Sequence, residues 1–387
     1  MEYKKINELT AVVTGGTPST RKNEYWDNGD IPWLQSGCCQ NCDVDSTEKY
    51  ITKEGYNNSS THMMPADTVM IALTGATAGK VGYLKFEACG NQSITGILPC
   101  ESLNQRYLFF YLLSQREKIL ADCVGGAQAH ISQSYVKNMT IPILAIKEQE
   151  QIVGELTKLS NIVSLRQEEI QQLDALIKAR FVEMFGDYIN EGGKPLSELA
   201  TITGGLTKNS KRNTFNLKMP YLRVANVFFN RLDLNEILEI GVREDEIGKT
   251  LLEAGDLLFV EGNGSIEQIG RVAIWDGSIN QILHQNHLIK ARFHKKTILP
   301  EYALFYFMSQ EGRQQIISKS VSTSGLNTLS VNKISSLILP MPPIELQERF
   351  AAFVTQVNKS KFDTMTFAPI YAIINLYLHT YFYQGRR

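Results

Sequence analysis

The stretch IPILAIKEQEQI, residues 141–152, ends one sequence pattern and begins another. Its Pro142 stops a short apolar run, because proline lacks the N–H group that a β-ladder needs. The Glu and Gln residues that follow are favoured at the positive N-terminal end of a helix. The stretch LPMPPIELQERF, residues 339–350, has the same organisation. Each stretch therefore predicts a last strand that is followed at once by a helix.

A coiled-coil pattern follows the first of these stretches. Its apolar residues recur at alternating steps of four and three, and no glycine or proline interrupts residues 155–185. At 1.5 Å per residue, a helix of roughly 30 residues reaches about 45 Å, which is more than one turn of DNA. We predict a helical spacer over residues 148–187. Its seam residues are Ile152, Leu156, Leu159, Val163, Ile170, Leu173 and Ile177.

The second stretch predicts a shorter helix. The pattern of apolar positions is lost at Lys361 and Thr364, and the tail after them shows no heptad. We expect a second spacer helix in the region 345–387, reaching residue 363 or so and ending in a divergent tail. Its seam residues are Phe350, Val354 and Val357.

The sequence before each of these helices occurs twice. LTAVVTGGTPS at 9–19 corresponds to LATITGGLTKN at 199–209, and IPWLQ at 31–35 corresponds to MPYLR at 219–223. Further strand patterns between glycine turns, and one helix pattern, follow in the same order in both copies. We therefore predict an α/β (α+β) protein in which long helices separate two similar mixed-sheet domains. The predicted domains are residues 1–147 and 188–344.

The composition limits the function. The chain has 39 Lys and Arg against 40 Asp and Glu, which gives a net charge of −1. Because a protein that binds DNA alone usually has a basic surface, any DNA contact must be local or shared with other subunits. No signal sequence opens the chain, so we expect a cytoplasmic protein that does not cross a membrane. All six cysteines precede residue 124 and are expected to be reduced thiols.

Further segments of the two copies and of the long helix are TGGTPS (14–19), TGATAGKVG (74–82), GGAQAHIS (125–132), the Pro-x-x-x-x-x-Glu-Gln pattern and ARFVEMFGD (179–187). Together with the repeat, these segments resemble the specificity subunit of type I restriction-modification systems. The resemblance implies that each domain is a target recognition domain, which reads one half of a bipartite site in double-stranded DNA. It also implies that the long helices form an antiparallel coiled coil, set the spacing and dock the modification (methyltransferase) subunits.

The resemblance also implies that the chain is not itself an enzyme. Methylation and cleavage would belong to modification subunits and to restriction subunits that join through the complex. The chain is then expected to bind no cofactor, with S-adenosylmethionine and ATP on the partner subunits.

Basic and amide side chains at loop and strand tips are the candidates for DNA contact, because they can form paired hydrogen bonds with base edges. Arg21 and Lys22 follow the first Gly-Gly turn, and Lys208, Lys211 and Arg212 follow the second. This parallel placement favours DNA binding over the alternative, a structural adaptor whose duplicated domains bind protein. The other candidates are Thr74, Thr77, Lys80, Gln128, Arg223, Arg271 and Asn327, of which Gln128 and Asn327 best fit base edges.

Three other functions are disfavoured by the motifs. TGATAGKVG has only three residues between its first two glycines, and valine stands where a phosphate loop has Ser or Thr. The Cys39-x-x-Cys42 pair has no counterpart in the second copy, so we predict no metal site. Pro342-Pro343 lacks the Asn or Asp and the aromatic residue that flank such a pair in a base-flipping methyltransferase.

Overall fold

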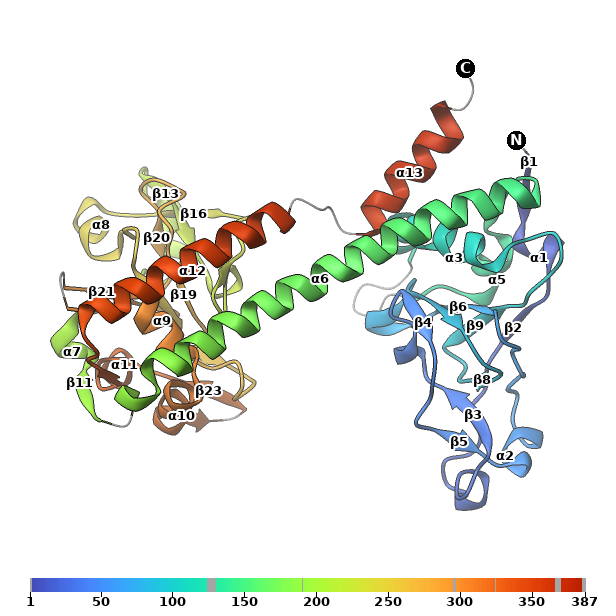
Figure 1. Ribbon diagram of the computed structural model, residues 1–387, viewed down its shortest axis with the longest axis horizontal. Coiled ribbons are helices and arrows are strands. Elements are labelled where there is room, and N and C mark those ends of the chain that lie inside the picture. Colours follow the sequence, from blue (N-terminus) through green and yellow to red (C-terminus); the bar gives the residue numbers. More distant parts are fainter. Residues whose placement is uncertain are drawn as a thin grey trace. The chain divides into compact units, whose positions relative to one another are not determined.

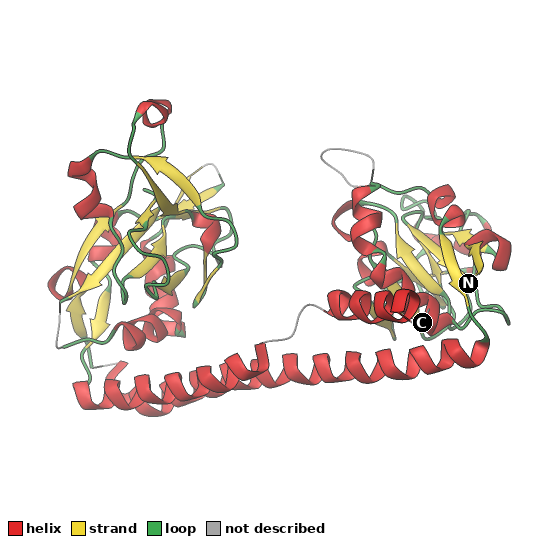
Figure 2. Ribbon diagram, turned by 90° about the horizontal axis from the view of Figure 1, so that it is seen from above, coloured by secondary structure: helices red, strands yellow, loops and turns green. Residues whose placement is uncertain are grey.

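The sequence repeat is a repeat of structure. The computed structural model describes residues 2–123, 130–189, 191–294, 297–323, 325–365 and 370–384. It divides into a first unit, residues 1–167 with 366–387, and a second unit, residues 168–365. Each unit contains one larger sheet, smaller sheets and several helices, which Figure 2 shows in yellow and red.

A five-stranded mixed sheet in the order β2-β9-β6-β7-β4 forms the centre of the first unit (Figure 1). A second sheet has the order β5-β3-β8, and β1 pairs with β10. The strands are β1 (Glu2–Lys5), β2 (Val12–Thr14), β3 (Ile31–Leu34), β4 (Cys42–Val44), β5 (Tyr50–Ile51), β6 (Val69–Ala72), β7 (Val81–Leu84), β8 (Cys89–Gly90), β9 (Ile94–Ile97) and β10 (Thr140–Ile143). The helices are α1 (Ile6–Leu9), α2 (Lys53–Asn57), α3 (Gln105–Ser114), α4 (Arg116–Ala121), α5 (Gln133–Asn138) and α13 (Ile370–Gln384).

The second unit is built on the same plan. Its larger sheet has the order β12-β21-β17-β19, its second sheet has the order β16-β13-β20, and β11 pairs with β24. The second unit also contains a β14-β15 hairpin and a β18-β23-β22 sheet. The strands are β11 (Gly193–Pro195), β12 (Ala200–Gly204), β13 (Lys218–Leu222), β14 (Val227–Phe228), β15 (Arg231–Leu232), β16 (Leu238–Gly241), β17 (Leu257–Val260), β18 (Gly262–Asn263), β19 (Val272–Ile274), β20 (Leu283–His284), β21 (Leu288–Phe293), β22 (Val321–Thr323), β23 (Leu326–Thr328) and β24 (Ile338–Pro340). The helices are α7 (Leu196–Leu199), α8 (Glu244–Thr250), α9 (Pro300–Met308), α10 (Gln310–Lys319), α11 (Val331–Ser335) and α12 (Ile344–Met365).

Backbone hydrogen bonds establish which residues are equivalent in the two units. Ile131 N donates to Leu73 O at 2.9 Å, and Leu329 N donates to Glu261 O at 2.7 Å. In the same way, β3 and β13 each have one antiparallel and one parallel neighbour. The structural correspondence therefore extends to individual residues.

The Gly-Gly turns allow a close approach between loop and strand. A Cβ atom on Gly15 would lie 2.0 Å from Gly90 O, and a Cβ atom on the equivalent Gly205 would lie 2.1 Å from His284 O. No side chain fits at these distances. Glycine at both places therefore lets the chain that follows it run against β8 or β20.

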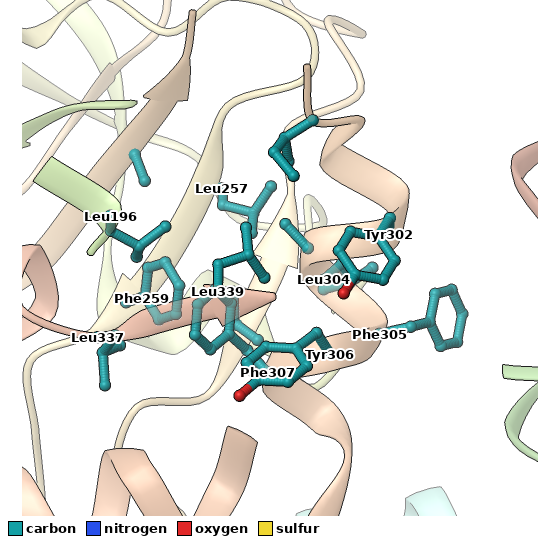
Figure 3. Close-up of a cluster of buried hydrophobic side chains, with 14 of the residues drawn as sticks. Leu196, Leu257, Phe259, Tyr302, Leu304, Phe305, Tyr306, Phe307, Leu337 and Leu339 are labelled. Carbon is teal, nitrogen blue, oxygen red and sulfur yellow. The ribbon is translucent and has the colours of Figure 1, made fainter. Parts of the chain in front are cut away.

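The main core of the second unit lies between the larger sheet and α9. Figure 3 shows the side chains of Leu257 and Phe259 from β17 beside those of Tyr302 and Phe307 from α9. The rings of Phe259 and Phe307 meet edge to face at 5.3 Å. In the first unit α3 packs against β6 and β7 in the corresponding place. These two helices are the aromatic segments that the sequence repeat pairs.

The helix α6 (Ile146–Ile189) supplies residues to the cores of both units and contains the predicted range 148–187. Ile152 and Leu156 are buried in the first unit, and Ile177, Phe181 and Phe185 are buried in the second. The remaining predicted seam residues are buried or half-buried; they are Leu159, Val163, Ile170 and Leu173.

The end of α6 pairs with α12 within the second unit (Figures 1 and 2). The ring of Phe350 lies 5.4 Å from the rings of both Phe181 and Phe185. Further along α12, Lys361 Nζ lies 2.5 Å from Asp174 Oδ1. Because later residues of α12 contact earlier residues of α6, the two helices are antiparallel. The seam therefore continues at Lys361 through an ion pair, although the sequence pattern ends there.

The C-terminal tail forms a packed helix, which its sequence pattern did not predict. Ile374 and Leu378 of α13 belong to the core of the first unit, where α13 packs on α3. Tyr377 Oη donates a hydrogen bond to a carboxylate oxygen of Glu155 on α6. The tail lacks a heptad because it packs on an aromatic helix of the first unit as well as on α6.

Candidate nucleic-acid interface

A polar and aromatic recess opens beside β3 in the first unit. It has a volume of about 790 Å³. Its amide, hydroxyl and aromatic groups are the side-chain types that hydrogen-bond to base edges and stack on bases. The recess is lined by Thr17, Thr20, Asn23, Trp26, Asn28, Gly29, Trp33, Gln35, Glu48, Lys49, Tyr50, Asn91 and Gln92.

The wall of this recess is held by hydrogen bonds from two indoles. Trp33 Nε1 donates to Gly16 O at 3.0 Å, and Trp26 Nε1 donates to Ser19 O at 3.2 Å. The two rings meet edge to face at 5.0 Å. The loop after the Gly-Gly turn is thereby fixed against β3, which gives the recess a rigid side.

Several polar groups of the recess remain free to bind a ligand. Within the described part of the chain, the side chains of Asn23, Asn28 and Gln35 make no hydrogen bond. Gln92 Oε1 accepts a hydrogen bond from Thr17 Oγ1 at 2.5 Å, while the Gln92 amide N–H groups keep their donor capacity. Free amide donors and acceptors in one recess are suited to reading base edges.

An equivalent recess lies beside β13 in the second unit. It is smaller, with a volume of about 330 Å³. Tyr221 occupies the place of Trp33. Trp33 precedes Leu34, whose carbonyl accepts a hydrogen bond from Asn91 N after β8, and Tyr221 precedes Leu222, whose carbonyl accepts one from Gln285 N after β20. The recess is lined by Lys208, Asn209, Arg212, Asn213, Lys218, Tyr221, Leu238, Glu239, Ile240 and Gly241. It is more basic than the first recess.

Four of the predicted basic residues lie exposed on the loops after the Gly-Gly turns. The side chains of Arg21, Lys208 and Lys211 make no hydrogen bond or ion pair with any residue that the structure describes. Lys22 Nζ lies 3.0 Å from Tyr25 Oη and 3.4 Å from Glu24 Oε1. These two contacts raise the pKa of Lys22. All four side chains are exposed to solvent.

Arg212, a predicted DNA contact, forms its contacts within the second unit. Arg212 is 8% exposed and pairs with Glu246 through both carboxylate oxygens, at 2.9 and 3.1 Å. Its other donors bond to the carbonyls of Thr207 and Gly241. The Arg212 guanidinium lowers the pKa of the Glu246 carboxyl group. Arg212 therefore shapes the recess rather than presenting a free charge.

Asn327 and Arg223 are also committed to contacts within the second unit. The buried Asn327 amide, a predicted base contact, donates to Asn263 O and Gly264 O at 3.3 and 3.2 Å. Arg223 donates to Glu236 Oε2 at 2.6 Å. Gln128 lies outside the described residues.

The residues predicted from TGATAGKVG lie on the turn between β6 and β7. Thr77 Oγ1 donates to Thr74 O at 3.3 Å, and Lys80 Nζ donates to Gln40 Oε1 at 2.6 Å. The second-unit residue at the place of Lys80 is Arg271, which lies half-buried against Phe228. This turn is not part of either recess.

The sequence patterns did not predict the amide and aromatic residues of the first recess, above all Trp26, Gln35 and Gln92. Two signals were present. Gln35 ends the repeated segment that contains Trp33. Gln92 lies within GNQS at 90–93, which is equivalent to HQNH at 284–287 in the second copy.

The cysteines of the first unit do not form a metal site within the described residues. No group of three or more His, Cys, Asp or Glu side chains is placed there to hold a metal ion. Cys39 is buried and Cys42 is exposed. Nor is any helix in the described part of the chain both long and apolar enough to span a membrane.

The family model for the type I restriction modification DNA specificity domain matches this chain twice, over residues 1–175 and 193–369. The chain belongs to this family. The two matches fall on the two copies of the repeat. Members of the family act in DNA specificity, so the domain is a recognition domain and not a catalytic one.

Known members of the specificity family are similar over one copy or over both. The EcoKI specificity subunit of Escherichia coli strain K12 is 26% identical over 91% of this chain and 81% of its own length. The MjaIX specificity subunit of Methanocaldococcus jannaschii is 23% identical over 91% and 85%. The EcoR124I/EcoR124II specificity subunit of Escherichia coli is 33% identical over 42% of each chain, so that match spans less than half of the relative.

Two solved structures share the fold. The S subunit of a type I restriction-modification system from M. genitalium aligns with a TM-score of 0.51 and 14% identity, over 98% of this chain and 94% of that one. A chain from a study of complex assembly and conformational transition in the type I system aligns with a TM-score of 0.55 and 16% identity, over 98% and 97%.

Proposed function

We propose that each unit of this chain reads one half of a bipartite site in double-stranded DNA. The observation that carries the proposal is the pair of recesses at equivalent places beside β3 and β13. Their different residues, amide-rich in one and basic in the other, give each unit its own base preference. Two modest readings on one chain then combine into one specific interaction.

The helix α6 is proposed to set the distance between the two half-sites. It runs without a break for 44 residues, which corresponds to about 66 Å at 1.5 Å per residue. Because both units pack onto this helix, its length would set the number of base pairs between the two half-sites. The antiparallel pairing with α12 supports stiffness at its C-terminal end.

The exposed faces of α6 and α12 are proposed to dock the modification subunits, and restriction subunits join through the complex. S-adenosylmethionine and ATP would be bound by those partners, in the cytoplasm. The near-neutral charge of the chain supports such sharing, because phosphate contacts usually dominate DNA affinity. The adaptor alternative gains no support, since the recesses offer free amides and cations rather than a broad apolar face.

Substitution in one recess tests the reading of half-sites. Gln35→Ala with Gln92→Ala should change the bases that are methylated in the first half-site and leave the second unchanged. Lys208→Ala with Lys218→Ala should do the reverse. Sequencing of methylated positions in cells that carry the complete system provides the readout. If both double variants gave the same methylated positions as the wild type, the assignment of the recesses to the half-sites would be refuted.

Lengthening α6 tests the spacing. Insertion of seven residues after Arg166 keeps the heptad phase and adds about 10 Å, which corresponds to roughly three base pairs. The methylated half-sites should then lie farther apart by that amount, with unchanged sequences. An insertion of the same length in the loop after Glu191 is the control and should leave the spacing as it was.

A further inference from the structure

A cluster of arginine and phenylalanine side chains, contributed by the β14–β15 hairpin, the residue just before β19 and α10, lies outside the recess of the second unit. The guanidinium carbons of Arg231 and Arg271 lie 4.3 and 5.1 Å from the ring centre of Phe228. The guanidinium carbon of Arg313 lies 4.9 Å from the ring centre of Phe229. We name these five residues the Arg231 cluster.

The backbone around the Arg231 cluster holds it in place. Asn230 turns the hairpin with a positive φ of 49°, a conformation that Asn tolerates better than most residues. Its N–H donates to Val272 O at 2.9 Å, which ties the hairpin to β19. Arg313 Nη1 donates to Ile269 O at 2.7 Å and ties α10 to the loop before β19. The cationic groups are therefore carried by three elements that are fixed to one another.

No described carboxylate compensates the positive charges of the Arg231 cluster. None of its three arginines has a carboxylate at ion-pairing distance among the described residues. The hydrogen bonds that they do make go to backbone carbonyls, which carry no net charge. By contrast, other arginines of the second unit pair with Glu or Asp; they are Arg212, Arg223, Arg243 and Arg292.

Partial burial of Arg271 and Arg313 favours the binding of an anion at the cluster. Burial lowers the pKa of both Arg271 and Arg313, yet a guanidinium stays protonated in proteins. Arg271 Nε is buried without a hydrogen-bond partner among the described residues. An anion that approaches the exposed Arg231 would relieve the mutual repulsion of these charges.

The first unit has cations at two of the same places. Gly79 precedes Lys80, and Gly270 precedes Arg271; their N–H groups donate to the equivalent strands at 2.9 and 3.1 Å. A Cβ atom on Gly79 would meet Ile119 of α4, and a Cβ atom on Gly270 would meet Ile316 of α10. The residue three places before each isoleucine is an arginine, Arg116 or Arg313. The second unit adds Arg231 and the two phenylalanine rings.

We propose that the Arg231 cluster binds the phosphate backbone of double-stranded DNA next to the half-site that the second unit reads. This inference rests on the proposed function and adds the location of phosphate contacts. Arginine forks match phosphate oxygens, and stacking on Phe228 holds the guanidinium planes in a fixed orientation. A chain with a net charge of −1 needs such local contacts, because it has no basic surface overall.

The salt dependence of DNA binding tests the proposal on the full-length chain. Arg231→Gln, Arg271→Gln and the double variant should weaken binding equally to a duplex with the recognised site and to one without it. The slope of log Kd against log salt concentration should fall by about one for each phosphate contact removed. Arg231→Lys should retain the slope, because it keeps the charge. Arg243→Gln, which removes an exposed arginine paired with Asp245, is the matched control and should leave the slope unchanged.

The outcomes separate this inference from the proposed function. A wild-type chain without DNA binding would overturn both. If all variants kept the wild-type salt slope, the phosphate-binding role of the Arg231 cluster alone would be refuted. The same would follow if the variants lost affinity only for the duplex that contains the recognised site. Unchanged DNA binding together with lost assembly with the modification subunits would assign the cluster to an acidic protein surface. Because Arg231 is exposed, its substitution should leave the thermal unfolding of the chain unaltered, which serves as the folding check.

Discussion

Gln149 and Gln347 make the same hydrogen bonds in the two units. The Oε1 atom of Gln149 accepts from Asn104 N at 2.8 Å, and that of Gln347 accepts from Leu299 N at 2.9 Å. Each Nε2 donates at 2.9 Å to the carbonyl five residues earlier in the chain. Both side chains are fully buried. The glutamine of the repeated stretch thus joins the start of the long helix to the residue that precedes the aromatic helix.

Replacement of Gln149 by leucine should destabilise the first unit. The change leaves Asn104 N and Leu144 O buried without partners, and such groups cost about 1–3 kcal/mol each. We expect the free energy of unfolding, measured with urea, to fall by about 3 kcal/mol. Gln151→Leu on the exposed face of α6 is the control and should change it by less than about 0.5 kcal/mol. Equal effects of the two variants would contradict this account.

Truncation of Leu378 should show that α13 belongs to the core of the first unit. Leu378 is 3% exposed, whereas Leu376 on the same helix is 70% exposed. Leu378→Ala should lower the free energy of unfolding by about 2–4 kcal/mol, because it removes buried methyl groups and leaves a cavity. Leu376→Ala should have little effect. Urea unfolding of the two matched variants provides the measurement, and a similar midpoint for both would show that α13 does not pack there.

The ion pair between Lys361 and Asp174 should contribute little to stability. The Asp174 side chain is 53% exposed, so solvent screens the attraction although Lys361 is mostly buried. A double-mutant cycle with Lys361→Met and Asp174→Asn should give a coupling energy below about 1 kcal/mol that decreases in high salt. A large coupling that did not depend on salt would mean that solvent does not reach the pair.

Acid should destabilise the second unit through His284. Burial lowers the pKa of His284 from 6.5 to about 4. Between these values the unfolded chain binds a proton that the folded chain does not, so the free energy of unfolding decreases as the pH falls from 6.5 to about 4. The loss from this group is roughly 3 kcal/mol.

His284→Asn keeps a donor toward Thr250 O and cannot titrate, so its unfolding free energy should lose less on acidification than that of the wild type. Calorimetry at pH 7 and pH 4 measures the difference. The exposed His62, replaced by Gln, is the control and should leave the pH dependence unchanged. A wild-type acid response in His284→Asn would assign that response to other groups.

The candidate site was predicted only in part. The loops after the Gly-Gly turns, where the sequence placed candidate residues, line the two recesses, because only glycine allows the close approach at Gly15 and Gly205. The charge of a side chain did not reveal whether it is free. Lys208 is exposed, whereas Arg212, four residues later, forms an ion pair with Glu246 of α8.

By itself, the sequence determined the repeat, the long helix and the stretches that join strand to helix, because each depends on neighbouring residues and on periodic spacing. Tertiary structure alone decided which cations stay free and where the tail packs. The pair Arg212–Glu246 joins residues 34 apart, and the contact Tyr377–Glu155 joins residues 222 apart. Such contacts leave no local pattern in the sequence, since they form only when the backbone brings distant segments together.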